Sequence, residues 1–369
     1  MRIALLTYST RPRGGVVHTL ALAEALAAGG DDVTVFTLGR GGDGAFFRPV
    51  DPAVTIEVVA LADVDGETVG GRVLRSIDAL AAALAGRADE FDVVHAQDCI
   101  SANAAGPCIR TVHHLDAFTT PELAACHERA IVTPIAHVCV SRSVADELVA
   151  GWGIAATVIP NGVDAARFEA AASDAPAARA ARAAWRDELP PGPIVLSVGG
   201  IEPRKGTIDL VDAMVRVRRD VPDVQLVIAG GETLFDHRDY RAAFDARCAA
   251  TGVAPVVLGP VADDRLPALV AVADAFAFPS CKEGFGLAAM EALAAGIPVV
   301  MRDLPVLREV FDGAATFASD PDATGVALVG ALAGSGPGPG AGIALARRHR
   351  WDDAADAHRR FYRAVLPTL

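Results

Sequence analysis

Residues 281–300, CKEGFGLAAMEALAAGIPVV, carry two carboxylates, Glu283 and Glu291, in a largely apolar segment. The apolar run around Glu291 predicts a buried helix that ends at Gly296 and Pro298. A buried, ionised carboxylate is stable only when hydrogen-bond donors surround it. We therefore predict that Glu291 accepts hydrogen bonds from a diol, such as the two hydroxyls of a ribose. The alternative is that both glutamates are exposed, and for Glu283 alone the two interpretations are equally good.

The loop before this helix has the features of an anion-binding site. The backbone N–H groups of Phe285, Gly286 and Leu287 fall at the start of the predicted helix, where donors lack intrahelical partners. The same end carries positive partial charge and suits a phosphate. Gly284 and Gly286 allow a ligand to approach the backbone closely. One short segment could thus hold a sugar, a pyrophosphate and a ribose in a row.

The elements that must position these residues form a regular series. Short β-branched runs alternate with longer Ala- and Leu-rich stretches, and most runs lack polar alternation. This pattern predicts parallel strands buried between helices. It is interrupted at 166–193, which is rich in Ala and Arg, is closed by prolines and reads as a linker with some helix. We therefore predict an α/β protein with Rossmann-like domains at 1–165 and 194–350, and a C-terminal helix at about 351–369 that crosses back to the first domain.

Composition excludes several classes of protein. The 369 residues have a formal net charge of −13, which disfavours a general nucleic-acid surface and allows at most peripheral membrane contact, although a local basic site is compatible with it. The 6 cysteines form no CxxC pair, so we expect reduced thiols and no zinc. The amino terminus reads as a strand and no apolar stretch is long enough to span a membrane. We expect a cytoplasmic protein.

The spacing of Glu283 and Glu291, with Gly-Phe-Gly between them, resembles the donor-binding signature of retaining GT-B glycosyltransferases of family 4. The resemblance implies two Rossmann-like domains that face each other across a cleft. It also implies transfer of a sugar from a UDP- or GDP-linked donor to an acceptor hydroxyl, as in hexosyltransferases. It assigns Glu291 to the nucleotide ribose and Glu283 to the transferred sugar. Phe285, Gly286 and Leu287 are assigned to the sugar and pyrophosphate.

A second motif, SVGGIEPRKGT at 197–207, follows the first predicted strand of the second domain. Arg-Lys pairs in loops are commonly solvated, but the resemblance places Arg204 and Lys205 beside the donor phosphates, where cations stabilise a leaving group. The family usually carries Gly-Arg directly after the strand, whereas this chain has Gly199-Gly200. Either Arg204 supplies the missing charge from a different angle, or donor binding is impaired.

Residues of the first domain also follow predicted strands. Gly14 and Gly15 open a helix whose amides could meet the donor phosphate, and the resemblance places this loop in the active site. It also places a histidine near the transferred sugar; alignment of TVH favours His113, with His114 second. Paired histidines can mark a metal site, but no third ligand stands at a suitable spacing. The candidates for acceptor contacts are His18, His95, Asp98 and His114, and for His18 a structural role is equally plausible.

The resemblance implies a retaining reaction that needs neither a metal nor another cofactor. The Asp63–Asp65 tripeptide DVD matches a metal-binding pattern of a different fold and is rejected. No carboxylate of the first domain stands out as a nucleophile, so a front-face attack, in which the leaving phosphate takes the acceptor proton, fits the residues present. The alternatives are a sugar-nucleotide epimerase or phosphorylase of the same fold, and a non-catalytic nucleotide-binding protein.

Overall fold

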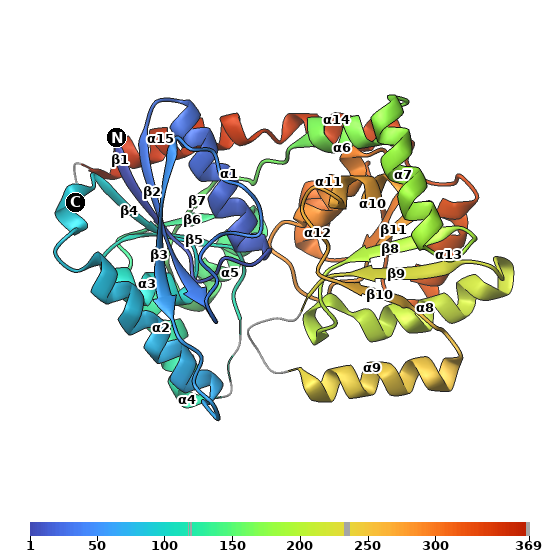
Figure 1. Ribbon diagram of the computed structural model, residues 1–369, viewed down its shortest axis with the longest axis horizontal. Coiled ribbons are helices and arrows are strands. Elements are labelled where there is room, and N and C mark those ends of the chain that lie inside the picture. Colours follow the sequence, from blue (N-terminus) through green and yellow to red (C-terminus); the bar gives the residue numbers. More distant parts are fainter. Residues whose placement is uncertain (117, 119, 232–236, 367–369) are drawn as a thin grey trace. The chain divides into compact units, whose positions relative to one another are not determined.

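The computed structural model describes residues 1–116, 118, 120–231 and 237–366, and it divides into two compact units (Figure 1). Unit 1 comprises Met1–Gly162 together with Trp351–Leu369, and unit 2 comprises Val163–Arg350. Each unit has a parallel sheet and its own apolar core. Each is therefore described by itself.

In the described part of unit 1, seven strands form one sheet in the order β3-β2-β1-β4-β5-β6-β7, and every recorded pairing is parallel. The central strands are fully buried because helices cover the sheet, which explains their unbroken apolar sequences. The strands are β1 (Arg2–Leu6), β2 (Asp32–Arg40), β3 (Val54–Leu61), β4 (Val93–Ala96), β5 (Ile109–Val112), β6 (Ala136–Cys139) and β7 (Thr157–Val158).

The helices of unit 1 connect these strands, and one comes from the far end of the chain. They are α1 (Gly14–Ala28), α2 (Val69–Leu84), η1 (Ala88–Glu90), α3 (Cys99–Ala105), α4 (Pro121–Val132), α5 (Arg142–Trp152) and α15 (Trp351–Val365). The C-terminal helix α15 packs beside α1 (Figure 1). Its apolar face enters the unit 1 core, where Ala355 and Tyr362 are fully buried.

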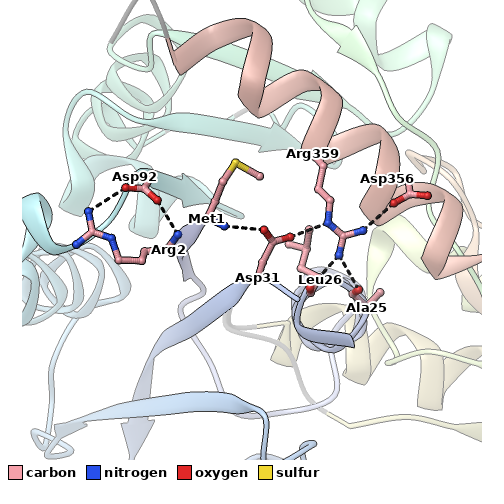
Figure 2. A network of polar contacts seen from close by, with 8 residues as sticks. All are labelled: Met1, Arg2, Ala25, Leu26, Asp31, Asp92, Asp356 and Arg359. Atoms are coloured by element: carbon pink, nitrogen blue, oxygen red, sulfur yellow. Dashed lines mark hydrogen bonds and ion pairs between the residues drawn. The ribbon is translucent and has the colours of Figure 1, made fainter. Parts of the chain in front are cut away.

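Polar contacts fix α15 on unit 1, as Figure 2 shows. Arg359 Nε donates to Asp31 Oδ2 at 2.6 Å, and Arg359 Nη2 donates to the carbonyl of Leu26 at 2.8 Å. The second oxygen of Asp31 accepts from the amino terminus at 2.9 Å. The guanidinium lies so close to α1 that a Cβ on Gly29 would stand 1.7 Å from Arg359 Nη2. The absence of a side chain at Gly29 therefore leaves room for the Arg359 guanidinium in this position.

In the described part of unit 2, six strands form a sheet in the order β10-β9-β8-β11-β12-β13, again with parallel pairings. The strands are β8 (Ile194–Val198), β9 (Gln225–Ala229), β10 (Val256–Gly259), β11 (Ala275–Phe278), β12 (Val299–Arg302) and β13 (Thr316–Ala318). The helices are α6 (Ala165–Ala172), α7 (Pro176–Glu188), η2 (Pro203–Lys205), α8 (Thr207–Asp220), α9 (Arg238–Thr251), α10 (Leu266–Val272), α11 (Leu287–Ala294), α12 (Pro305–Phe311), α13 (Pro321–Leu332) and α14 (Pro339–Arg348).

The segment that we expected to be a linker, 166–193, lies within unit 2 and is largely helical. Both α6 and α7 pack against α10. Trp185 is buried there, and the guanidinium of Arg265 stacks 3.9 Å from its ring centroid. The Ala- and Arg-rich sequence resembles a linker because its apolar face is narrow. In the fold, that face packs against α10.

The prediction of two parallel-sheet α/β domains is confirmed. The Gly- and Pro-rich segment 335–342 is helical from Pro339, where α14 begins. Gly342 allows that helix to approach α11, since a Cβ there would stand 2.8 Å from Leu293. Tertiary packing thus outweighs the poor helix propensity of glycine. Within the described residues, no helix is both long enough and apolar enough to cross a membrane.

Candidate active site

Three of the predicted site residues meet in unit 2, at the carboxyl ends of β8 and β11. Lys205 Nζ lies 2.6 Å from Glu283 Oε1, and Arg204 Nη1 lies 3.2 Å from the same oxygen. Arg204 also pairs with Glu202 at 3.1 Å through Nη2. The structure therefore brings together two cations and a carboxylate that are almost 80 residues apart in sequence. The two cations lie on the loop after β8 and the carboxylate lies on the loop after β11, and these two strands are adjacent in the sheet.

The two cations keep Glu283 ionised. Burial opposes its ionisation, but the charges of Lys205 and Arg204 outweigh burial and lower the pKa of Glu283 to about 2. A carboxylate in this state cannot donate a proton near neutral pH. It can hold the two cations in place and accept hydrogen bonds from a ligand hydroxyl.

Lys205 is positioned by the backbone around it. Its stem lies against Gly199, where a Cβ would stand 3.2 Å from the lysine Cδ and Cε. Its ammonium lies 5.2 Å from the ring centroid of Phe278, at the end of β11. The backbone N–H of Cys281 donates to the carbonyl of Arg204 at 2.7 Å and joins the two loops. Gly199 thus leaves room for the lysine, while the neighbouring Gly200 adds no charge.

Between Glu283 and α11 the backbone turns sharply at Gly286, whose φ is +103°. A Cβ there would lie 3.0 Å from Phe311, so glycine is required by both conformation and space. Among the described residues, no acceptor bonds the backbone N–H groups of Phe285, Gly286 or Leu287. The Phe285 side chain is buried against Phe311 and His349, so its ring serves the core and its amide is the group left for a ligand.

Glu291 lies in the middle of α11, half-buried, and accepts no hydrogen bond from any residue that the structure describes. Burial raises the pKa of Glu291 to about 7; the charge of Arg167 opposes the rise, and Asp263 and Asp164 add to it. Arg167 does not neutralise Glu291, because its Nη2 pairs with Asp263 Oδ2 at 2.8 Å. A half-buried carboxylate without a partner is expected where a ligand supplies the donors.

In unit 1, the glycine loop and one histidine lie together. A Cβ on Gly15 would stand 3.6 Å from His113 Cδ2, and Gly14 at the start of α1 is exposed with nothing within 4 Å of such a Cβ. Burial, followed by the charges of His114 and His95, lowers the pKa of His113 to about 3. The ring is therefore neutral, and among the described residues its Nε2 has no hydrogen-bond partner. A neutral imidazole of this kind can exchange a hydrogen bond with a ligand.

The other candidates of unit 1 have partners within the protein. His18 is buried, and its Nδ1 lies 2.9 Å from Asn161 Oδ1. His95 is fully buried between Tyr362 at 2.7 Å and Thr111 at 2.8 Å. The structure thus gives both histidines positions in the core beside α15.

The remaining two candidates also have protein partners. Asp98 caps α3 by accepting from Ser101 N at 2.8 Å, and it accepts from Tyr8 N at 3.0 Å. His114 Nε2 lies 3.1 Å from Asp116 Oδ2 near the surface.

One residue at this edge escaped the sequence analysis. Gln97 follows β4 directly and is 1% exposed, yet neither its Oε1 nor its Nε2 has a hydrogen-bond partner among the described residues. Its neighbours His95 and Asp98 drew attention because their side chains titrate. Nothing in the sequence distinguishes a buried glutamine with partners from one without, so the fold alone reveals this group.

The sequence of this chain matches known protein families. The family described as "Glycosyl transferases group 1" matches residues 183–327, and "Glycosyltransferase Family 4" matches residues 12–167. The glycogen synthase of Mycobacterium tuberculosis is 31% identical over 346 residues, which cover 84% of this chain and 80% of that protein. The two family matches fall on the two halves of the chain.

Solved structures share the arrangement of elements. A sucrose-phosphate synthase from Thermosynechococcus elongatus superposes with a TM-score of 0.79 at 20% identity over 100% of both chains. HepE from Anabaena, in complex with UDP-glucose, superposes with a TM-score of 0.75 at 18% identity over 100% of both chains. The fold is therefore GT-B. The chain belongs to glycosyltransferase family 4, group 1, and is a glycosyltransferase.

Proposed function

We propose that this glycosyltransferase is a retaining enzyme that moves a sugar from a nucleoside-diphosphate sugar, UDP- or GDP-linked, to an acceptor hydroxyl. Unit 2 binds the donor and unit 1 binds the acceptor. The observation that supports the proposal is that Glu291 is half-buried and has no partner among the described residues. It lies eight residues after Glu283, which pairs with Lys205. A ribose diol supplies the two donors that this carboxylate lacks.

Each group then has one role along the bound donor. Glu283 accepts hydrogen bonds from the transferred sugar, and the free amides from Phe285 to Leu287 bind the pyrophosphate. Lys205 and Arg204 stabilise the negative charge that develops on the leaving diphosphate. Among the described residues, Arg204 divides its charge between Glu202 and Glu283, whereas Lys205 pairs with Glu283 alone, so Lys205 carries the larger share.

The bond changes follow from these roles. The bond between the anomeric carbon and the leaving phosphate oxygen breaks, and the acceptor oxygen bonds to that carbon from the same face. Attack from that face keeps the configuration of the sugar. The acceptor proton passes to the leaving phosphate oxygen. Glu283, with its pKa of about 2, does not serve as an acid, which agrees with a proton transfer inside the substrate pair. Lys205 and the amides supply the charge stabilisation, and we propose that no metal is needed.

The test begins with thermal-shift titrations of UDP, GDP, ADP and CDP on the wild type and on Glu291→Ala. At a ligand concentration of ~100 times Kd, binding stabilises the folded state by ~2.7 kcal/mol. One nucleotide should stabilise the wild type and not Glu291→Ala. The configuration of the product, read by NMR, then distinguishes retention from inversion, and activity in EDTA tests the metal.

The same assays separate the alternatives. Conversion of the donor to another sugar nucleotide without an acceptor identifies an epimerase, and release of a sugar phosphate in the presence of phosphate identifies a phosphorylase. If none of the four nucleotides stabilises the wild type, this chain does not bind such donors, which is the outcome expected if the Gly200 departure has impaired binding.

A further inference from the structure

One buried histidine of unit 1 contacts both places where the chain passes between the two units. His18 lies near the start of α1 and is 1% exposed. Its Nδ1 lies 2.9 Å from Oδ1 of Asn161, a buried residue directly before Gly162, where the chain leaves unit 1. Its ring centroid lies 5.3 Å from that of Trp351, where the chain returns as α15. Residues from both crossings of the chain therefore surround the His18 ring.

His18 also packs against His113. Gly15 and His18 are three residues apart on α1, so they lie on one face of that helix. A Cβ on Gly15 would stand 3.7 Å from His113 Nε2. The ring centroids of His18 and His113 are 4.7 Å apart, with an angle of 77° between the ring planes. The His113 ring, just after β5, therefore rests on this face of α1.

Packing alone does not explain a histidine at position 18. Burial, followed by the charges of His113 and His358, lowers the pKa of His18 well below its usual value, so the ring is neutral. A neutral imidazole has one N–H, and Asn161 Oδ1 can only accept, so Nδ1 carries the proton. The buried Nε2 then has no partner among the described residues. An apolar side chain would fill the same space without leaving a polar atom unsatisfied.

The bond to Asn161 supplies what an apolar side chain could not. A ring held only by packing is free to turn about the bond between its Cβ and Cγ atoms, whereas a hydrogen bond at Nδ1 selects one orientation. Groups that must be placed accurately are commonly held in this way by a neighbouring side chain with a fixed rotamer. The orientation of the His18 ring in turn determines which of its atoms contact His113.

We propose that His18 is a positioning residue, which holds the ring of His113 in one orientation and is itself held by Asn161 and Trp351 at the two crossings of the chain. The inference deepens the proposed function and rests on it, because the orientation of His113 affects the reaction only if His113 approaches the transferred sugar. Displacement of such a group by about 1 Å can lower a rate ~100-fold. A change at either crossing would therefore reach His113 through one side chain.

The first experiment observes His113 in the full chain, by NMR of histidine side chains labelled with 15N and 13C. Asn161→Ala removes the bond to His18 and leaves both histidine rings in place, so it tests orientation without changing the side chains that surround His113. We expect this variant to shift the ring resonances of His113 and to change the tautomer of His18. Unchanged His113 resonances in Asn161→Ala would overturn the inference.

A second buried histidine provides the matched control. His137 on β6 is 5% exposed, and its Nε2 lies 2.8 Å from the carbonyl of Ile131. His137→Gln therefore perturbs a buried imidazole with a protein partner of its own, but it should leave the His113 resonances as they are in the wild type. A shift of equal size in His137→Gln would mean that His113 responds to any loss of stability.

The second experiment measures turnover of UDP-glucose and GDP-mannose, with water as the acceptor, together with nucleotide affinity. His18→Phe keeps a ring of similar size but removes the bond to Asn161. It should lower turnover about 10- to 100-fold and leave nucleotide affinity unchanged, because we place the nucleotide in unit 2. Loss of nucleotide affinity in His18→Phe, at unchanged turnover, would contradict the inference.

A double-mutant cycle separates positioning from general stability. If His18 acts through His113, His113→Ala should cost much less turnover in the His18→Phe background than in the wild type. Losses that add independently overturn the inference. If His18→Phe does not fold, Asn161→Ala takes its place in the cycle.

The two experiments also distinguish this inference from the proposed function. If no nucleotide stabilises the wild type, or neither sugar nucleotide is turned over, the proposed function has failed, and the NMR experiment still decides whether His18 holds His113. If the wild type is active while Asn161→Ala and His18→Phe match it in turnover and in the His113 resonances of Asn161→Ala, only this inference has failed.

Discussion

Helix α1 of unit 1 and helix α11 of unit 2 are similar in composition, but only one of them has a carboxylate that pairs with another residue of the protein. Both helices are nearly apolar and begin next to glycines, and each carries one glutamate, Glu24 or Glu291. Glu24 binds both Nη atoms of Arg48 at 2.7 Å and accepts from Asp51 N at 3.1 Å. Glu291 has no such partner among the described residues. An apolar helix therefore does not by itself distinguish the two carboxylates; the absence of a protein partner at Glu291 does.

The largest expected effect concerns Lys205, the cation that pairs with Glu283 in unit 2. Lys205→Ala should lower kcat about 100- to 1000-fold, because it removes the main charge opposite the leaving diphosphate. Steady-state kinetics with the identified donor measure this. Lys282→Ala, on the loop that carries Glu283, is the control and should retain activity near that of the wild type. Equal losses in both variants would mean that Lys205 has no special role.

The second effect tests the two glutamates directly. Glu291→Ala should weaken nucleotide binding about 10- to 100-fold, since a carboxylate that accepts hydrogen bonds from a ligand contributes roughly 1.5–3 kcal/mol. Glu24→Ala should leave nucleotide affinity unchanged but lower the free energy of unfolding by about 1 kcal/mol through the lost Arg48 pair. Calorimetry and urea denaturation of both variants decide the matter. The comparison fails if Glu24→Ala is the variant that loses the nucleotide.

A third, smaller effect concerns the glycines that open the two helices. Gly286→Ala should lower the free energy of unfolding by roughly 1–2 kcal/mol, because φ is +103° and Phe311 lies against the added methyl. Gly14→Ala meets nothing within 4 Å and should be tolerated. Thermal unfolding of the two variants measures the difference, and equal stability would remove the conformational requirement at Gly286.

The last prediction concerns the pH dependence of stability. Burial raises the pKa of Glu291 to about 7 from its usual 4.5. In that window the folded state binds more protons than the unfolded state, so the stabilisation is complete below about pH 4.5 and is lost as the pH rises through about 7. The contribution is at most about 1.4 kcal/mol per pH unit. Glu291→Gln should remove this slope in urea denaturation at a series of pH values, and an unchanged slope would show that Glu291 ionises normally.

The sequence by itself determined the two parallel sheets and the segment that we propose binds the donor. Buried parallel strands require unbroken apolar runs, and the turn at Gly286 requires glycine, so both leave local signals. The proximity of Arg204 and Lys205 to Glu283 was expected from a family resemblance. The distances came from the fold, because adjacent strands β8 and β11 are far apart in sequence.

Only the tertiary structure decided which polar groups already have partners. It joined 166–193 to unit 2, enclosed His18 and His95 beside α15, and left Gln97 without a hydrogen bond. The physical reason is the same in each case: a residue type specifies what it can bind, whereas satisfaction of that capacity depends on atoms that the chain brings in from distant positions.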